Sequence, residues 1–142
     1  CSLLEYNVRL GDPETQAVLP LMDFDFAELC LAIIESRIDA FNFAWKDGAV
    51  CAPVAVADGY PSIYRKGDII HIDDSALQVS GAKFFAAGAV LNNNEELITS
   101  GGRVLALSAY GTDADDAWNK AYQAMNAVQF AGMGFRKDIG RE

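Results

Sequence analysis

Glu5, Asn7 and Arg9 recur at every second position near the start of the chain. Side chains two residues apart on a strand share one face and lie about 7 Å apart, so residues 3–10 are predicted to form a strand with one polar and one apolar face. Mg²⁺ takes one or two carboxylates together with neutral and phosphate oxygens. The carboxylate and the amide therefore suit a divalent ion; a polar strand face covered by solvent or by another domain is the alternative interpretation.

Two helices are predicted after this strand. Residues 11–14, Gly-Asp-Pro-Glu, interrupt it because glycine permits unusual dihedral angles and proline lacks a backbone donor. A short helix is predicted over residues 17–22 and a longer one over residues 24–38, where apolar residues recur at helical spacing. Asp23 or Asp25 is the predicted N-cap of the longer helix.

The remaining sequence predicts an antiparallel β unit, because short apolar segments alternate with turn-forming residues. A first strand over residues 49–57 follows the turn sequence Lys46-Asp47-Gly48. Further strands are predicted within residues 69–72, 83–91, 95–99 and 103–110.

The last predicted element is a helix capped by Thr112 or Asp113 and ending near residue 132. Trp118 and Tyr122 share its apolar face and are interpreted as core residues. The predicted fold class is α+β, and composition places a boundary near residues 36–48.

Composition limits the classes of partner. The chain has 142 residues, 51% of them hydrophobic, which suffices for one domain or for a small domain with a piece of a neighbour. Its formal charge of −9 disfavours binding to nucleic acid or to an anionic membrane surface. Three cysteines with no paired spacing argue against a disulfide framework or a zinc site and are typical of reduced thiols, which favours a cytoplasmic protein.

No apolar run is long enough to span a bilayer, and no signal peptide is recognisable. The chain opens within a strand-like pattern and without Met. We therefore expect it to be a piece of a longer protein.

The segment 5–16, Glu-Tyr-Asn-Val-Arg-Leu-Gly-Asp-Pro-Glu-Thr-Gln, resembles the one that closes the ATP-grasp domain in glycinamide ribonucleotide synthetases. Further blocks resemble that family, in the same order, within residues 59–68, 99–105 and 132–140. The resemblance implies that residues 1–40 end an ATP-grasp catalytic domain, with a strand and helices. Residues 41–142 would form a small antiparallel β-rich C-terminal domain with a packed helix, a half-barrel sandwich like the C-domain of biotin carboxylase.

The same resemblance assigns roles to the first block. Glu5 and Asn7 would bind the Mg²⁺ or Mn²⁺ that bridges the ATP phosphates. Arg9 would be a catalytic residue beside the transferred phosphoryl group or the acyl phosphate, a place that suits a guanidinium because it stays charged and offers paired donors. Asp12 and Glu14 would orient the glycine ammonium or the phosphoribosylamine amine; capping of the helix that follows is the equally weighted alternative.

Arg103 follows two glycines whose bare backbone permits close approach. By resemblance to related purine ligases it would hold the ribose 5-phosphate, although pairing with an acid is the alternative. Arg65 and Lys66, on a turn that contains glycine, form a second and weaker candidate for the same phosphate, with a solvated loop as the alternative.

One stretch departs from the family pattern. Where the family usually has Phe-His-Ala-Gly-Thr, this chain has Phe-Ala-Ala-Gly-Ala at residues 85–89. Ala86 and Ala89 therefore lack two polar groups, which weakens the predicted substrate site on the β unit. His71, the sole histidine, lies between isoleucines and is interpreted as structural.

The resemblance implies an ATP-dependent ligase that joins glycine to 5-phosphoribosylamine in purine biosynthesis. The chain has no Gly-rich phosphate loop, so it would need the N-terminal and ATP-grasp parts of the same enzyme and be inactive alone. One alternative is a non-catalytic docking or carrier-type β module, which would present a lysine at a hairpin tip where residues 92–94 offer only asparagines. Another ATP-grasp ligase with a different acceptor is the third possibility, disfavoured by residues 11–16.

Overall fold

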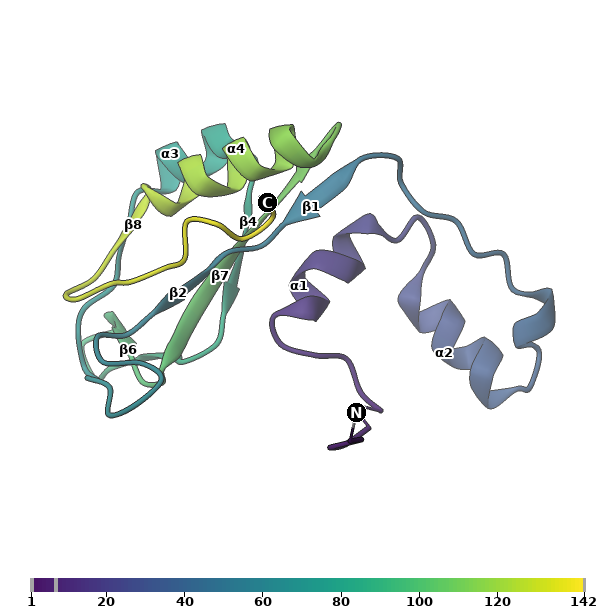
Figure 1. Cartoon of the computed structure of the whole chain (residues 1–142), viewed down its shortest axis with the longest axis horizontal. Helices are drawn as coiled ribbons and strands as arrows, with labels where there is room; N and C mark the ends of the chain where they lie inside the picture. The colour runs from purple at the N-terminus through teal and green to yellow at the C-terminus, as the bar shows by residue number, and fades with distance from the viewer. Residues whose placement is uncertain (1, 7, 142) are drawn as a thin grey trace.

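The computed structural model describes residues 2–6 and 8–141. Figure 1 shows two parts, a β-rich domain and a helical arm that extends to one side of it. We use "helical arm" for residues 14–40 and "C-terminal tail" for residues 131–141. The tail runs back across the domain (Figure 1).

The centre of the domain is the strand β7 (Arg103–Gly111), to which three other strands pair antiparallel. They are β1 (Ala49–Cys51), β2 (Val54–Val56) and β4 (Lys83–Ala86). The strand predicted over residues 49–57 is thus split between β1 and β2. Pro53 has no amide hydrogen to give to the ladder, but its carbonyl still accepts from the Leu107 amide at 3.2 Å.

Two short antiparallel pairs complete the β structure. The strand β3 (His71–Ile72) pairs with β8 (Val128–Gln129), and β5 (Ala89–Leu91) pairs with β6 (Leu97–Thr99). The strand predicted over residues 83–91 is divided at Ala87 and Gly88, between β4 and β5. The antiparallel arrangement predicted for the domain is confirmed.

Two helices belong to the β-rich domain. The helix α4 (Ala114–Met125) begins after Asp113, whose carboxylate accepts from the Asp116 amide at 2.8 Å, so the predicted cap is confirmed. It ends before residue 132 because the chain turns at Asn126 and enters β8. The helix α3 (Asp74–Ser80) was not predicted; Asp73 caps it, and Gly81 ends it with a φ of +67°.

The core lies between β7 and α4. Leu105, Leu107 and Met125 are at most 1% exposed, because β7 presents its apolar side chains to the inner face of the helix. Trp118 and Tyr122 stack at 4.3 Å and pack, half-buried, at the edge of a smaller cluster around Cys51. Their predicted packing role is confirmed.

The helical arm consists of α1 (Glu14–Val18), α2 (Phe26–Ile34) and the 3₁₀ turns η1 (Leu19–Leu21) and η2 (Ile38–Ala40). The first helix begins earlier than predicted and tightens at Pro20 into η1. The predicted cap Asp25 is confirmed by a 2.7 Å bond from the Ala27 amide. The prediction that α2 reaches residue 38 is wrong, because Ser36 adopts a φ of +54° that ends the helix.

The strand predicted over residues 3–10 is wrong for its described part. Residues 2–6 and 8–10 are in no strand, and Leu4 and Val8 are 94% and 93% exposed. An isolated extended segment satisfies no backbone ladder, and none of the described segments pairs with this one. The assignment of residues 1–40 to an ATP-grasp domain and the domain division at residues 40 and 41 stay predictions.

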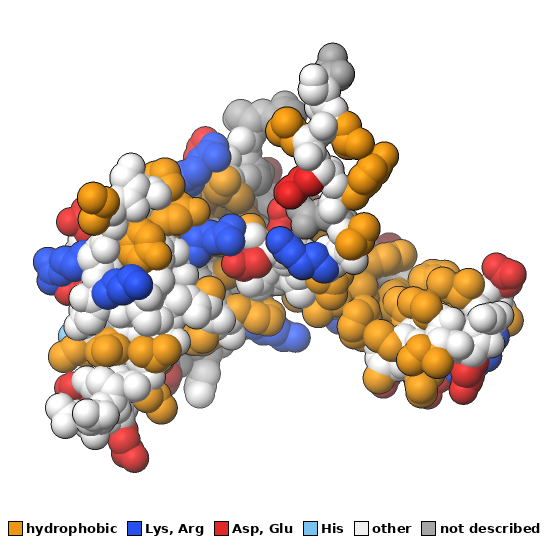
Figure 2. All heavy atoms as spheres, turned by 90° about the horizontal axis from the view of Figure 1, so that it is seen from below, with side chains coloured by type: hydrophobic (Ala, Val, Ile, Leu, Met, Phe, Trp, Pro, Cys, Tyr) orange, Lys and Arg blue, Asp and Glu red, His pale blue; other side chains and the backbone are white. Residues whose placement is uncertain are grey.

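Apolar side chains also cover much of the helical arm, as Figure 2 shows on its outlying part. The exposed ones include Phe26, Leu31, Ile33 and Ile34 of α2. Among the described residues, no helix is both long enough and apolar enough to cross a bilayer.

Candidate functional site

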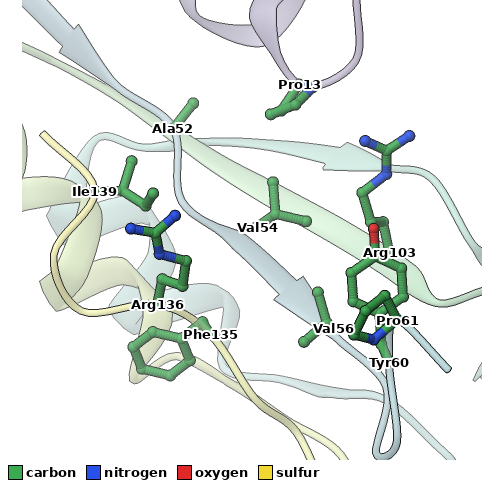
Figure 3. Close-up of a pocket in the computed structure, with 10 residues that line it drawn as sticks. All are labelled: Pro13, Ala52, Val54, Val56, Tyr60, Pro61, Arg103, Phe135, Arg136 and Ile139. Carbon is green, nitrogen blue, oxygen red and sulfur yellow. The ribbon is translucent and has the colours of Figure 1, made fainter. Parts of the chain in front are cut away.

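A cavity of about 540 Å³ lies where the residue before the arm, Pro13, the strand β2 and the C-terminal tail come together (Figure 3). Its lining is mostly apolar, with two guanidinium groups. The lining residues are Pro13, Ala52, Val54, Val56, Tyr60, Pro61, Arg103, Phe135, Arg136 and Ile139. A concave apolar floor with a few polar groups is the usual composition of a small-molecule site.

Arg103 is the first residue of β7, and its side chain reaches Asp12, two residues before the arm. Its Nη1 donates to the Asp12 backbone carbonyl at 2.8 Å, and its Nη2 lies 3.3 Å from the Asp12 carboxylate. Both side chains are 43% exposed. The fold thus brings together two predicted substrate-binding residues that are 91 positions apart, and Arg103 does pair with an acid.

Glycines allow the backbone around Arg103 to pack closely. A Cβ atom on Gly88 would lie 2.6 Å from the Arg103 carbonyl oxygen and 2.6 Å from the Cα of Gly101. A Cβ on Gly102 would overlap the ring of Tyr60. The Gly101-Gly102 pair is therefore needed for packing, which places Arg103 beside Tyr60 at the rim of the cavity.

The acidic residues at the start of α1, Asp12 and Glu14, interact with the helix itself. Asp12 accepts from the Gln16 side-chain amide at 2.8 Å, and no described side chain caps α1, whose N-cap residue is Pro13. Glu14 is the first residue of the helix, where its charge is favourable to the helix dipole. Binding of a substrate ammonium by Asp12 or Glu14 stays a prediction.

Arg136 lies in the C-terminal tail, and the sequence patterns do not predict it as a site residue, although its block resembles the family. Its Nε and Nη2 donate to the two carboxylate oxygens of Asp138 at 3.0 and 2.6 Å. This pairing raises the pKa of Arg136 and lowers the pKa of Asp138, because the charged forms are hydrogen-bonded to each other. Tyr122 of α4 donates its hydroxyl to the Arg136 carbonyl at 2.6 Å, which ties the tail to the domain.

The first sequence block is not part of this cavity. Glu5 is exposed, and among the described residues Arg9 donates only to the carbonyl of its neighbour Leu10, at 2.9 Å. Asn7 lies outside the described residues. Within residues 2–6 and 8–141, no group of three or more His, Cys, Asp or Glu side chains is placed to hold a metal ion.

The second candidate site for the ribose phosphate is the pair Arg65 and Lys66, and both side chains already contact other residues of the chain. Arg65 forms an ion pair with Asp68, which is only 9% exposed, and Lys66 lies 5.4 Å from the centre of the Tyr64 ring. Neither cation lines the cavity. These contacts stabilise the loop between β2 and β3.

The positions that depart from the family pattern also lie away from the cavity. Ala86 ends β4 and is exposed, and Ala89 begins β5 and is half-buried. Neither lines the cavity, so their lost polar groups do not alter its walls. His71 is exposed in β3, opposite Gln129.

Residues 49–142 match the family model described as phosphoribosylglycinamide synthetase, C domain. The chain is 48% identical, over 98% of its length, to a phosphoribosylamine–glycine ligase of Clostridium acetobutylicum, and it covers 32% of that protein. Its identity to the same ligase of Escherichia coli is 41% over 97% of the chain and 32% of the ligase.

A third relative is the bifunctional purine biosynthetic protein ADE1 of Schizosaccharomyces pombe, 47% identical over 96% of the chain and 17% of that protein. The crystal structure of the phosphoribosylamine–glycine ligase of Thermotoga maritima matches with a TM-score of 0.75 and 32% identity, over 96% of this chain and 33% of that one. The chain thus spans about a third of the length of the ligases that it matches.

Proposed function

Because this chain belongs to the phosphoribosylglycinamide synthetase family, we propose that it works as the C-terminal part of a phosphoribosylamine–glycine ligase. The observation that carries the proposal is its 48% identity, over 98% of the chain, to a protein of that name. The reaction is ATP plus glycine plus 5-phosphoribosylamine giving ADP, phosphate and glycinamide ribonucleotide. The free thiols of Cys30 and Cys51 are compatible with action in the cytoplasm.

The proposed reaction has two steps. A carboxylate oxygen of glycine attacks the γ-phosphorus of ATP, so that ADP leaves and glycyl phosphate forms. The amine of phosphoribosylamine then attacks the acyl carbon, loses a proton and displaces phosphate. Both steps build negative charge on oxygen, which fixed guanidinium groups stabilise.

Arg103 is the residue of the cavity that we assign to the ribose phosphate. Its guanidinium remains 43% exposed and keeps donors beyond those that contact Asp12. The close glycine packing behind it fixes the backbone from which the side chain extends. Bidentate donors on a fixed backbone are suited to a phosphate group.

Glu5 and Asn7 are proposed to hold the Mg²⁺ or Mn²⁺ that accompanies ATP, with Arg9 next to the transferred phosphoryl group. The exposed Glu5 carboxylate makes no ion pair with a described residue. Its chemistry fits a hard divalent ion that takes one or two carboxylates and several phosphate oxygens. When bound, such an ion would neutralise charge on the ATP phosphates.

The hairpin formed by β5 and β6 bears on the alternative of a carrier module. Asn92 closes its tip, because its side-chain oxygen accepts from the Asn94 and Glu96 amides at 2.9 and 3.0 Å. Residues 92–96 contain no lysine to which a prosthetic group could be attached. The tip therefore favours the ligase over the carrier.

A chimeric ligase tests the proposal. In it, this chain replaces the segment of the Escherichia coli ligase to which it is 41% identical, and formation of glycinamide ribonucleotide is measured. We expect turnover, and we expect Arg103→Ala to raise KM for phosphoribosylamine by about tenfold to a hundredfold, the cost of a hydrogen bond to a charged group.

The same substitution should leave KM for ATP nearly unchanged. Lys120→Ala is the matched control, because Lys120 lies on α4 and pairs with Asp116 away from the cavity. A folded chimera without turnover would refute the assignment of the chain to this ligase. An equal rise of both KM values in Arg103→Ala would refute the role of Arg103 and would leave the assignment of the chain to the ligase standing.

A further inference from the structure

Arg103 and Arg136 lie on opposite sides of the cavity. Figure 3 shows Arg103 on the side of Tyr60 and Pro61, and Arg136 on the side of Phe135 and Ile139, with the valines of β2 between them. Two guanidinium groups separated by an apolar floor fit one ligand with polar groups at both ends better than two unrelated ions.

The two arginines differ in how far their charge is compensated. Arg136 makes a bidentate pair with Asp138, at 3.0 and 2.6 Å, so its charge is largely offset. Arg103 has a neutral carbonyl at 2.8 Å and a carboxylate only at 3.3 Å. The side of Arg103 is therefore the more electropositive one and suits a phosphate dianion.

Arg136 nevertheless keeps donors. A guanidinium carries five N–H groups, and only its Nε and Nη2 donate to described residues. The Nη1 group makes no hydrogen bond with any residue that the structure describes. Donors whose charge is already balanced suit neutral oxygens, such as sugar hydroxyls, because no further charge compensation is required.

The backbone of Arg136 is fixed on the same wall. The Tyr122 hydroxyl donates to its carbonyl at 2.6 Å, and the Cys51 thiol lies 3.8 Å from the Ile139 carbonyl. Farther along the tail, the Arg141 guanidinium lies 3.6 Å from the centre of the Trp118 ring. These contacts hold the tail against the domain, so its side chains form a wall that is present before a ligand arrives.

We propose that Arg136 is a second ligand-binding residue of this cavity, and that it donates to the hydroxyl oxygens of a ribose phosphate whose phosphate group lies at Arg103. The inference rests on the proposed function, which supplies the sugar phosphate as the ligand class. It adds a residue and an orientation: the phosphate is directed to the start of β7 and the ring to the C-terminal tail.

The test uses the chain itself and two probes, ribose 5-phosphate and inorganic phosphate, in chemical-shift titrations by NMR. We expect Arg136→Ala to weaken the binding of ribose 5-phosphate by about fivefold, the effect of one lost hydrogen bond to an uncharged hydroxyl, and to leave the binding of inorganic phosphate within about twofold. Arg103→Ala should weaken the binding of both probes by about tenfold or more, since both carry the phosphate group. Lys137→Ala is the matched control, a tail cation that does not line the cavity.

Three results would overturn the inference. If Arg136→Ala weakens the binding of both probes equally, Arg136 contacts the phosphate group rather than the ribose hydroxyls, and the proposed orientation is wrong. If Arg136→Ala changes neither probe while Arg103→Ala weakens both, Arg136 has no part in binding and the role proposed for Arg103 stands. If neither probe shifts the cavity resonances of the unsubstituted chain, no ribose phosphate binds there, whereas the ligase assignment is still decided separately by turnover of the chimera.

Discussion

The contact between Asp12 and Arg103 is the residue-scale feature that most affects ligand binding. The carboxylate lies 3.3 Å from the guanidinium, and both side chains are 43% exposed. Exposed ion pairs of this kind contribute little to stability because water screens them. The same carboxylate, however, offsets part of the charge that a phosphate would use, so Asp12 competes with the proposed ligand.

The first prediction concerns Asp12→Asn. The substitution removes the negative charge and leaves the backbone carbonyl that accepts from Arg103 at 2.8 Å. We expect inorganic phosphate to bind the chain about two- to fivefold more tightly, the size of an exposed ion pair. NMR titration measures the affinity. Glu14→Gln is the control, because Glu14 is the next acid along the chain and the first residue of α1. Weaker phosphate binding in Asp12→Asn would show that Asp12 aids the binding of phosphate rather than competing with it.

The second prediction concerns Glu5→Gln in the chimeric ligase. The amide keeps the shape of the side chain but loses the charge that would hold a divalent ion against phosphate oxygens. We expect kcat to fall by at least about a hundredfold, and more steeply at limiting Mg²⁺, because metal-mediated charge stabilisation is worth several kcal/mol.

The melting temperature of this variant should be unchanged, because Glu5 is exposed and pairs with no described residue. Glu28→Gln, an exposed acid in the first turn of α2, is the matched control. Near-normal turnover of Glu5→Gln at limiting Mg²⁺ would exclude the metal role.

At the scale of the elements, aspartates begin three of the helices. Asp25, Asp73 and Asp113 accept from amides of the first turn at 2.7, 3.0 and 2.8 Å. These bonds satisfy donors that a helix leaves unpaired at its start. The Asp73 carboxylate also accepts from the Ser75 hydroxyl at 2.6 Å, and this bond is the main reason why its pKa is lowered, followed by the bond from the Ala76 amide.

The third prediction is a pH dependence centred on Asp73. Because its pKa is lower in the folded than in the unfolded chain, the stabilisation is complete above the unfolded pKa near 3.8 and is lost as the pH falls through the folded value. Asp73→Asn keeps a good capping residue without this titration. We expect its free energy of unfolding to fall less steeply than that of the unsubstituted chain below about pH 4.

Urea unfolding at several pH values measures this difference. Asp73→Ala should instead lower the free energy of unfolding at neutral pH as well, because it removes the cap itself. If the free energy of unfolding of Asp73→Asn falls with decreasing pH as steeply as that of the unsubstituted chain, Asp73 does not contribute to this pH dependence.

At the scale of the whole molecule, the helical arm and the β-rich domain differ in how firmly they are held. Ala32 is the only buried residue among the described positions before Cys51, whereas β7 and α4 share the main core. The arm is joined to the domain by few side-chain bonds, including Ser108 to the Gln16 carbonyl at 2.6 Å. Segments with little burial open locally at low free energy.

The fourth prediction follows from this difference. In native-state hydrogen exchange, we expect amides of α2 to exchange well before those of α4 and β7, which should open only with global unfolding. Leu107→Ala should lower the protection of α4 and β7 together, because a large-to-small change in a core costs about 2–5 kcal/mol, and it should leave α2 unchanged. Equal protection of α2 and β7 would mean that the arm and the domain unfold as one unit.

Local features of this chain were predictable because neighbouring residues determine them. The caps Asp25 and Asp113, the strand β7 and the antiparallel class of the domain follow from side-chain chemistry and apolar spacing within a few residues. The helix α3 was missed because Asp73-Asp74 also reads as a turn and the helix has only seven residues. Its identity as a helix depends on packing against α4 rather than on a long periodic pattern.

Long-range features needed the tertiary structure. A strand forms only where a partner backbone accepts its hydrogen bonds, so the alternation in residues 3–10 did not suffice to make one in the described part of that segment. Arg103 was recognisable as a candidate from the glycines before it, but its pairing with Asp12 spans 91 positions. Arg136 joins the cavity only because the C-terminal tail folds back over β2, and chain folding of that kind leaves no periodic signal in the sequence.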